Sequence, residues 1–223
     1  MMQAVIMAGG KGTRLATLTK DEIPKPMVPV AGKPLLLWQV ERLKENGITD
    51  IIMVIGHLGD KIREYFGDGE KFGVAIRYFE ETEPLGTAGS FYYLKDMIHG
   101  DRFVMMSGDL FFDIDFQRMI NFHEEKGAVA TLFVHPNGHP FDSDLLVLDH
   151  DDKITAFDSK YNVRDYWYEN CVNAGIFVFE KKICDYVPEP VKRNLENDVI
   201  KGMLEAGEPI YGYCSPEYVK DVG

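Results

Sequence analysis

The segment Ala8-Gly9-Gly10-Lys11-Gly12-Thr13-Arg14 follows directly on an apolar run, Ala4 to Met7, and Pro24-Lys25-Pro26 comes shortly after it. The apolar run is typical of a buried strand, so the glycines form a loop at a strand end. Glycine lets backbone N–H groups approach an anion closely because no Cβ stands in the way. Lys11, Arg14 and Lys25 add positive charge to the same region. This cationic density predicts a site for a triphosphate.

Two better-known phosphate loops do not fit this spacing. The Walker A motif needs Gly-x-x-x-x-Gly-Lys-Ser/Thr, and the dinucleotide fingerprint needs a third glycine where this chain has Leu15. A glycine turn with solvated basic side chains is the simpler alternative. However, Pro24 and Pro26 hold Lys25 in extended backbone, which favours a cation aimed at a ligand.

Length, charge and cysteine usage restrict the class of protein. A chain of 223 residues is long enough for one large domain with its own core. Its net charge of −12, from 24 basic and 36 acidic residues, argues against nucleic acid and anionic membranes as partners. No apolar stretch is long enough to span a bilayer, and the N-terminus lacks signal-peptide features. Cys171, Cys184 and Cys214 are widely spaced and suit buried free thiols, so we expect a cytoplasmic protein.

The first half of the chain alternates strands with helices. We expect strands at 4–7, 51–55, 74–79 and 103–106, and helices at 34–46, 61–66 and 86–97. This alternation predicts an α/β fold with a mostly parallel sheet covered on both faces. Ligands of such sheets bind beyond the carboxyl ends of the strands, where the glycine loop lies.

The second half is richer in strands. We expect helices at 115–126 and 195–205, and strands at 129–134, 145–148, 154–157, 176–179, 211–214 and 218–222. These strands predict a mixed sheet that covers the pocket. Because no internal repeat or flexible linker is present, we expect residues 1–223 to form a single domain with two lobes, about 1–110 and about 111–223.

Two acidic motifs are candidates for a metal site. Asp109, in Ser107-Gly108-Asp109, follows the strand at 103–106 and therefore lies at the ligand-binding edge. Mg²⁺ prefers oxygen ligands and bridges phosphate oxygens, although an Asx turn would also explain this aspartate. Asp113 and Asp115 form an Asp-x-Asp pair, the metal motif of many glycosyltransferases. Asp115 directly precedes a helix and is more simply an N-cap, with Asp113 as a turn residue.

The paired motifs Gly-Gly-x-Gly-Thr-Arg and Pro-Lys-Pro resemble those of the sugar-1-phosphate nucleotidyltransferases, the sugar nucleotide pyrophosphorylases, and the resemblance extends over residues 2–223. It implies a three-layer, Rossmann-like (GT-A-like) fold with a mixed, mostly parallel central sheet. It also implies nucleotidyl transfer from an NTP to a sugar 1-phosphate, with Mg²⁺ as cofactor, giving an NDP-sugar and pyrophosphate.

The resemblance assigns the nucleotide and metal sites residue by residue. Arg14, Lys25 and Asp109 are the implied catalytic residues, and Asp109 with Asp221 would hold Mg²⁺. Lys11 and Arg14 would contact the leaving phosphates and Lys25 the reacting ones. Asp221 matches the family's Asp-x-Gly-Thr, but the chain stops at Gly223, so we expect the natural chain to continue. The implied nucleotide-binding residues are Ala8, Gly9, Gly10, Lys11, Gly12, Thr13, Glu83, Pro84, Gly86, Thr87 and Gly108.

The sugar phosphate is assigned by weaker matches. Asp158 and Lys160 stand where relatives often show Glu-Lys-Pro, with Tyr161 in place of the proline, and Lys160 would contact the phosphate. Asn173 and Gly175 resemble the family's Asn-x-Gly, which contacts sugar hydroxyls. An ordinary surface lysine and a strand-entry turn are the alternatives.

Substrate identity rests on resemblance alone. Segments 158–167 and 217–223 look like those of D-glycero-D-manno-heptose 1-phosphate guanylyltransferases, which implies GTP, with mannose-1-phosphate guanylyltransferases second. A glycosyltransferase that uses Asp113 and Asp115, or a non-catalytic nucleotide-sugar sensor, remains an alternative. The aromatic segment 161–170 is either a lid or a contact in a homo-oligomer.

Overall fold

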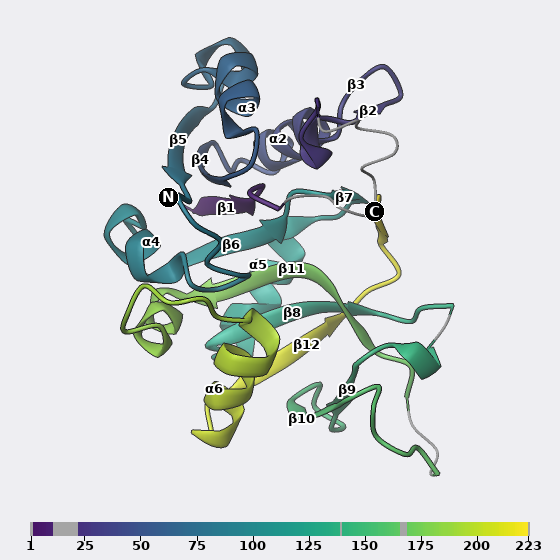
Figure 1. Cartoon of the computed structure of the whole chain (residues 1–223). Coiled ribbons are helices and arrows are strands. Elements are labelled where there is room, and N and C mark those ends of the chain that lie inside the picture. Colours follow the sequence, from purple (N-terminus) through teal and green to yellow (C-terminus); the bar gives the residue numbers. More distant parts are fainter. Residues whose placement is uncertain (1, 11–21, 139, 166–168, 223) are drawn as a thin grey trace.

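A seven-stranded sheet forms the centre of the computed structural model, which describes residues 2–10, 22–138, 140–165 and 169–222 (Figure 1). The strand order is β12-β8-β11-β6-β1-β4-β5. The strands are β1 (Gln3–Met7), β4 (Asp50–Ile55), β5 (Ala75–Glu80), β6 (Arg102–Ser107), β8 (Ala130–His135), β11 (Val172–Glu180) and β12 (Ile210–Cys214).

The sheet is mixed but mostly parallel, which confirms the predicted fold class. β1, β4, β5 and β6 are parallel, β11 runs antiparallel to both of its neighbours, and β12 is parallel to β8. The second half was expected to form a mixed sheet that covers the pocket; its strands β8, β11 and β12 instead extend the central sheet. The apolar side chains of β8 and β11 are buried on both faces, as expected for strands inside a sheet that helices cover on both sides.

Helices cover both faces of the sheet, as predicted. Alternate residues of β4 face opposite sides: Met53 packs in the same core cluster as α2 (Leu35–Glu45), and Val54 in the cluster that contains α4 (Phe91–Met97). The first cluster also holds α3 (Gly59–Phe66) and α5 (Phe116–Glu125), whereas the second holds η6 (Leu195–Ile200) and α6 (Lys201–Glu205). Among the described residues, no helix is long and apolar enough to cross a membrane.

Most helices lie where the sequence predicts them, with one correction. Asp115 is the N-cap of α5, and its side chain accepts a hydrogen bond from the Arg118 backbone N–H at 3.2 Å. The helix expected at 86–97 begins only at Phe91. Gly86 has a φ of +76° and forms a parallel bridge with Arg193, so the chain before α4 cannot be helical. The helix expected at 195–205 begins as the π-helix η6 and continues as α6.

Two strand predictions also need correction. Asp113, expected in a turn, ends the strand β7 (Leu110–Asp113), which pairs antiparallel with β13 (Tyr218–Asp221). β11 begins at Val172, so Asn173 lies inside the strand, at a register shift, and not in a turn before it. The remaining short elements are η2 (Lys25–Met27), β2 (Pro29–Val30), β3 (Lys33–Pro34), η3 (Glu70–Phe72), η4 (Pro140–Asp142), β9 (Leu145–Leu148), β10 (Ile154–Asp158) and η5 (Lys181–Tyr186).

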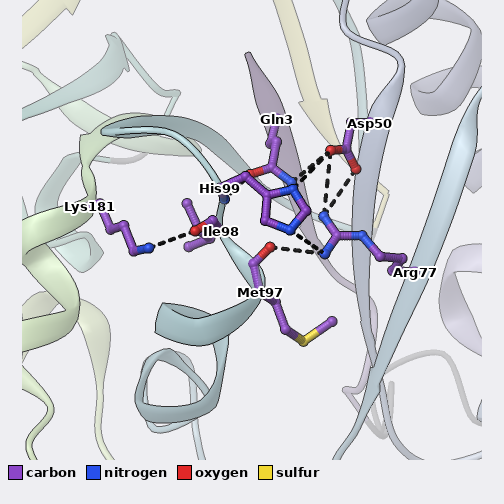
Figure 2. Close-up of polar contacts among 7 residues, drawn as sticks. All are labelled: Gln3, Asp50, Arg77, Met97, Ile98, His99 and Lys181. Carbon is purple, nitrogen blue, oxygen red and sulfur yellow. Dashed lines mark hydrogen bonds and ion pairs between the residues drawn. The ribbon is translucent and has the colours of Figure 1, made fainter. Parts of the chain in front are cut away.

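A polar network closes the amino-terminal edge of the parallel strands (Figure 2). Asp50, the first residue of β4, accepts from Gln3 of β1 at 2.8 Å and from Arg77 of β5 at 3.1 Å. The Gln3 side chain in turn accepts from the backbone N–H of His99, and Arg77 donates to the Met97 carbonyl at 3.0 Å. These bonds tie three strands to the end of α4. The opposite, carboxyl-terminal edge is left for ligands.

The three cysteines are free thiols, as predicted, but they are not all buried. Cys184 is buried, Cys171 is partly exposed and Cys214 is exposed. Burial raises the pKa of the Cys184 thiol to about 12, so this side chain behaves as a small core hydrophobe.

Candidate active site

Loops from three neighbouring parallel strands meet at the carboxyl-terminal edge of the sheet. The loop after β1 is bonded to both neighbours: the Ala8 N–H donates to Val54 at 2.8 Å, and the Gly108 N–H donates to Met7 at 2.9 Å. A Cβ on Gly108 would lie 3.0 Å from the Met7 carbonyl, so the loops touch through their backbones. This contact brings Asp109, at the end of β6, beside the glycine loop.

These loops enclose a cavity of about 650 Å³. This volume is within the range of small-molecule sites. Residues at the ends of the strands line the floor of the cavity. The segment 81–87 forms one wall and is called here the base loop. Its lining residues are Met7, Gly9, Gly10, Val54, Gly56, His57, Glu81, Thr82, Glu83, Pro84, Gly86, Thr87, Ser107 and Asp109.

Most of the predicted nucleotide-binding residues that are described line or support this cavity. Gly9, Gly10, Glu83, Pro84, Gly86 and Thr87 line it. Ala8 is buried beneath it, and Gly108 packs against Ala8. Lys11, Gly12, Thr13 and Arg14 lie outside the described residues. Their contact with the leaving phosphates therefore stays a prediction.

Lys25, Asp109 and Asp221 form a charged cluster, and Asp109 is its member in the lining of this cavity. Lys25 Nζ lies 2.5 Å from Asp109 Oδ2 and 3.7 Å from Asp221 Oδ1. The prediction that Lys25 lies in extended backbone is wrong: Pro24 is extended, but Lys25 is the first residue of the 3-10 helix η2, because the fixed φ of a proline also suits the first turn of a helix. The pairing of β7 with β13 places Asp221 opposite Leu110, and the Val222 N–H donates to the Asp109 carbonyl at 3.0 Å. Three distant parts of the sequence thus meet at one point.

The two carboxylates fit the expected Mg²⁺ ion. Both approach the same ammonium group, which shows that they converge on one cationic position. Mg²⁺ is commonly held by one or two carboxylates, with water and substrate phosphates completing the shell. No group of three or more His, Cys, Asp or Glu residues in the described part of the chain would hold a metal, so a protein-only cage is not present there. The donor set suits an ion completed by phosphate oxygens.

Two further cavities continue from the first toward the second half of the chain. One of about 560 Å³ shares Ser107 and Asp109 with the first cavity and extends to Asn173, Gly175 and Asp221. The other, of about 620 Å³, lies beyond it and reaches the β9–β10 hairpin. These two cavities share Asn137, Val172, Asn173 and Glu196. The three together form a continuous path along the edge of the sheet.

The residues predicted to bind the sugar phosphate are only partly brought together. Asn173 and Gly175 line the middle cavity, and Lys160 lines the outer one. Asp158 lines none of the three cavities in the described part of the chain. It is 6% exposed and accepts from Arg164 Nε at 2.7 Å, an ion pair that holds the loop after β10. A sugar-binding role for Asp158 has no support from this geometry.

Glu81 is a site residue that the sequence analysis missed. It follows β5 at the same edge of the sheet, and its Oε1 is buried without a hydrogen-bond partner among the described residues. Desolvation by burial raises the pKa of Glu81 to about 7, and a hydrogen bond with the backbone of Leu85 offsets part of that rise. An acidic residue at the carboxyl end of a parallel strand is the signal that could have identified it.

The Asp-x-Asp pair takes no part in this site. Asp115 caps α5, and Asp113, at the end of β7, lies 3.6 Å from Arg42 Nη1. Neither side chain lines any of the three cavities among the described residues. The geometry thus gives no support to a glycosyltransferase metal site at these positions.

Comparison with known proteins gives a family match over almost the whole chain. The family model described as Nucleotidyl transferase matches residues 3–223. A UTP–glucose-1-phosphate uridylyltransferase of Synechocystis sp. is 34% identical, over 94% of this chain and 57% of that protein. A mannose-1-phosphate guanylyltransferase of Mycobacterium tuberculosis is 32% identical, over 100% of this chain and 61% of that protein. The chain therefore spans about three fifths of the length of these curated relatives.

Solved structures show the same fold. HddC from Yersinia pseudotuberculosis is similar with a TM-score of 0.82 at 25% identity, covering 100% of this chain and 94% of that one. The same protein complexed with GMP-PN gives a TM-score of 0.81, covering 99% of this chain and 93% of that one. The likeness extends over the whole sheet and both of its helical layers.

Proposed function

Because this chain belongs to the nucleotidyl transferase family, we propose that it transfers a nucleotidyl group from a nucleoside triphosphate to a sugar 1-phosphate. The observation that carries the proposal is the position of Asp109. It lines both the first and the middle cavity, and it contacts Lys25 there. Two phosphorylated substrates repel each other, so their reaction needs positive charge where their sites meet. Lys25 supplies such a charge beside Asp109.

The chemistry requires positioning more than proton transfer. An oxygen of the sugar 1-phosphate attacks the α-phosphorus of the triphosphate, the α–β phosphoanhydride bond breaks, and pyrophosphate leaves in line. The attacking oxygen is already an anion, so no general base is needed. Lys25 offsets the repulsion between the two phosphates, and we assign Lys11 and Arg14 to the leaving phosphates. Mg²⁺ held by Asp109 and Asp221 would add positive charge at the same phosphate oxygens.

We further propose that the nucleotide is GTP. The Glu81 carboxylate lies in the first cavity, can only accept hydrogen bonds when ionised, and has a buried oxygen without a partner in the described part of the chain. Guanine presents two adjacent donors, N1–H and the exocyclic amino group, which would satisfy both carboxylate oxygens. Uracil and thymine present one N–H between two carbonyls, which a carboxylate repels. The GMP-PN complex of HddC and the guanylyltransferases among the relatives also support GTP.

For the sugar, we propose D-glycero-D-manno-heptose 1-phosphate, with mannose 1-phosphate as the second candidate. The middle cavity takes the phosphate end, near Asp109, and the outer cavity of about 620 Å³ continues past Asn173. Its walls carry Ser159 and Lys160, so hydroxyl groups entering it would find donors and acceptors. A seven-carbon sugar has a hydroxylated side chain one carbon longer than that of a hexose, and this space accommodates it.

A substrate matrix tests the proposal. Pyrophosphate release is measured with each of the four NTPs against a panel of hexose and heptose 1-phosphates, with Mg²⁺ present. We expect turnover with GTP and a manno-configured sugar 1-phosphate, fastest with the heptose. Sugar transfer from an NDP-sugar without pyrophosphate exchange would instead indicate a glycosyltransferase. Binding of an NDP-sugar with no turnover for any pair would indicate a sensor.

A further inference from the structure

One strap of chain joins the base loop to the sugar side of the site. Residues 191–196, called here the strap, follow η5 and include the first two residues of η6. The Arg193 N–H donates to the Leu85 carbonyl at 3.0 Å, and the Ala88 N–H donates to the Arg193 carbonyl at 3.1 Å. A Cβ on Gly86 would lie 2.3 Å from the Arg193 carbonyl oxygen, so the two segments are in direct backbone contact. The base loop and the strap are therefore joined through their backbones.

The Thr87 hydroxyl fixes the point where the strap enters η6. Its Oγ1 accepts from the backbone N–H of Leu195 at 2.8 Å. Leu195 is the first residue of η6 and is only 3% exposed, and the first N–H groups of a helix have no partner within the helix. Thr87 itself lines the first cavity. One hydroxyl thus belongs to the nucleotide side and satisfies a buried donor on the strap.

Glu196, the residue after Leu195, contacts the middle and outer cavities. Glu196 lines both the middle and the outer cavity, and its Oε1 accepts from Asn173 Nδ2 at 2.8 Å. Asn173 Oδ1 accepts from the Gly175 N–H at 3.0 Å. The Asn173 amide is therefore oriented by Glu196, and Glu196 stands directly after the residue that Thr87 holds.

We propose that Thr87 is a positioning residue for the sugar-phosphate site, acting through Leu195 and Glu196 on Asn173. The proposal rests on the proposed function, because it assumes that the cavity around Asn173 receives the sugar 1-phosphate. Thr87 lies in the nucleotide cavity, but its hydroxyl shapes the neighbouring one. This predicts that loss of the hydroxyl weakens sugar-phosphate binding more than nucleotide binding.

The test compares Thr87→Val with Thr87→Ser. We expect Thr87→Val to raise the KM for the sugar 1-phosphate roughly three- to tenfold, the effect of one lost hydrogen bond, and the Kd for the NTP by less. Thr87→Ser keeps the hydroxyl and should rescue most of the sugar-phosphate KM. A rise confined to the NTP Kd, or an equal rise in both constants, would overturn the proposal.

A second variant covers the case in which Thr87→Val folds poorly. Glu196→Ala should raise the sugar-phosphate KM through the loss of the same Asn173 contact. If both residues act along one route, the double variant Thr87→Val/Glu196→Ala should show less than the product of the two single effects. A combined effect equal to that product would contradict a shared route.

Binding without turnover separates this proposal from the proposed function. The Kd of the sugar 1-phosphate is measured by calorimetry for the wild type, Thr87→Val and Thr87→Ser. Weaker binding in Thr87→Val alone supports the positioning role even if no NTP is turned over. Binding that is equal in all three proteins refutes it, even if the wild type is an active transferase.

Discussion

Lys25 lies against two carboxylates and is mostly shielded from solvent. Its side chain is 10% exposed, and Asp109 and Asp221 both approach its ammonium group. A partly buried charge of this kind is costly unless it is paired, so the three groups depend on one another. When phosphates are bound, the ammonium group of Lys25 could pair with phosphate oxygens as well as with the two carboxylates. Its contact with Asp109, which lines both the first and the middle cavity, is what suits it to the reacting phosphates.

Replacement of Lys25 tests this role directly. We expect Lys25→Ala to lower kcat by roughly two to three orders of magnitude, because a preorganised charge at the transition state is lost. Lys71→Ala, at a distant surface position in η3, is the matched control and should retain wild-type turnover. Steady-state pyrophosphate release measures both. Turnover of Lys25→Ala within a few-fold of the wild type would contradict the assignment.

The position of Glu81 in the first cavity predicts that GTP binding depends on pH. Because the pKa of Glu81 is raised to about 7, its carboxylate becomes protonated as the pH falls through that value. A protonated carboxyl can no longer accept from both guanine donors, so the KM for GTP should rise below about pH 7 and stay low above it. In Glu81→Gln this step should vanish, and the preference for GTP over UTP should fall roughly tenfold or more.

The control for Glu81 is Glu80, the last residue of β5, which directly precedes it. Glu80 is exposed and pairs with Arg63 at 2.8 Å outside the cavity, so Glu80→Gln should keep both the GTP preference and the pH step. The KM for GTP and for UTP is measured for each variant between about pH 6 and pH 8.5. The same pH step in Glu81→Gln as in the wild type would assign it to the nucleotide and not to Glu81.

At the scale of elements, α5 is fixed to the sheet by a buried polar contact. His123, 1% exposed, contacts Thr131 Oγ1 of β8 at 2.8 Å and Glu180 Oε1 of β11 at 3.3 Å. Burial lowers the pKa of His123 below 6.5, although Glu180 offsets part of this effect. The folded protein therefore favours the neutral imidazole. This contact lies at the amino-terminal end of β6, away from the cavities.

This contact predicts a pH dependence of stability. Below about pH 6.5, His123 takes up a proton more readily in the unfolded protein than in the folded one. The stabilisation that the buried, neutral His123 contributes is therefore present above that pH and is lost as the pH falls. The slope is at most about 1.4 kcal/mol per pH unit. The free energy of unfolding, measured with urea, should fall more steeply between pH 7 and pH 5.5 for the wild type than for His123→Gln, whose side chain does not titrate. Parallel pH profiles for the two proteins would refute the contribution.

At the scale of the whole molecule, one sheet carries both halves of the chain (Figure 1). β6 from the first half pairs with β1 on one side and with β11 from the second half on the other. The three cavities follow this junction, with Asp109 at the end of β6 between them. The proposed nucleotide and sugar lobes therefore share one sheet, and the site is the line along which they join.

The sequence was sufficient where a signal is local. The apolar run before Gly9 and the helix capped by Asp115 are short-range patterns, because propensity and capping act over a few residues. Other predictions failed because a distant segment overrides local preference. The helix expected from Gly86 gives way to the contact with Arg193, and β7 forms because β13 pairs with it.

The α/β class and the mixed, mostly parallel sheet were thus determined by the sequence alone, because alternating strands and helices can pack in few ways. The tertiary structure decided which side chains meet: Asp109 with Asp221, Glu81 with the first cavity, and Thr87 with the start of η6. It also pairs Asp158 with Arg164, away from the lining of the three cavities in the described part of the chain. Each of these depends on contacts between residues far apart in the chain. Burial and pairing energies arise only once the fold brings such groups together.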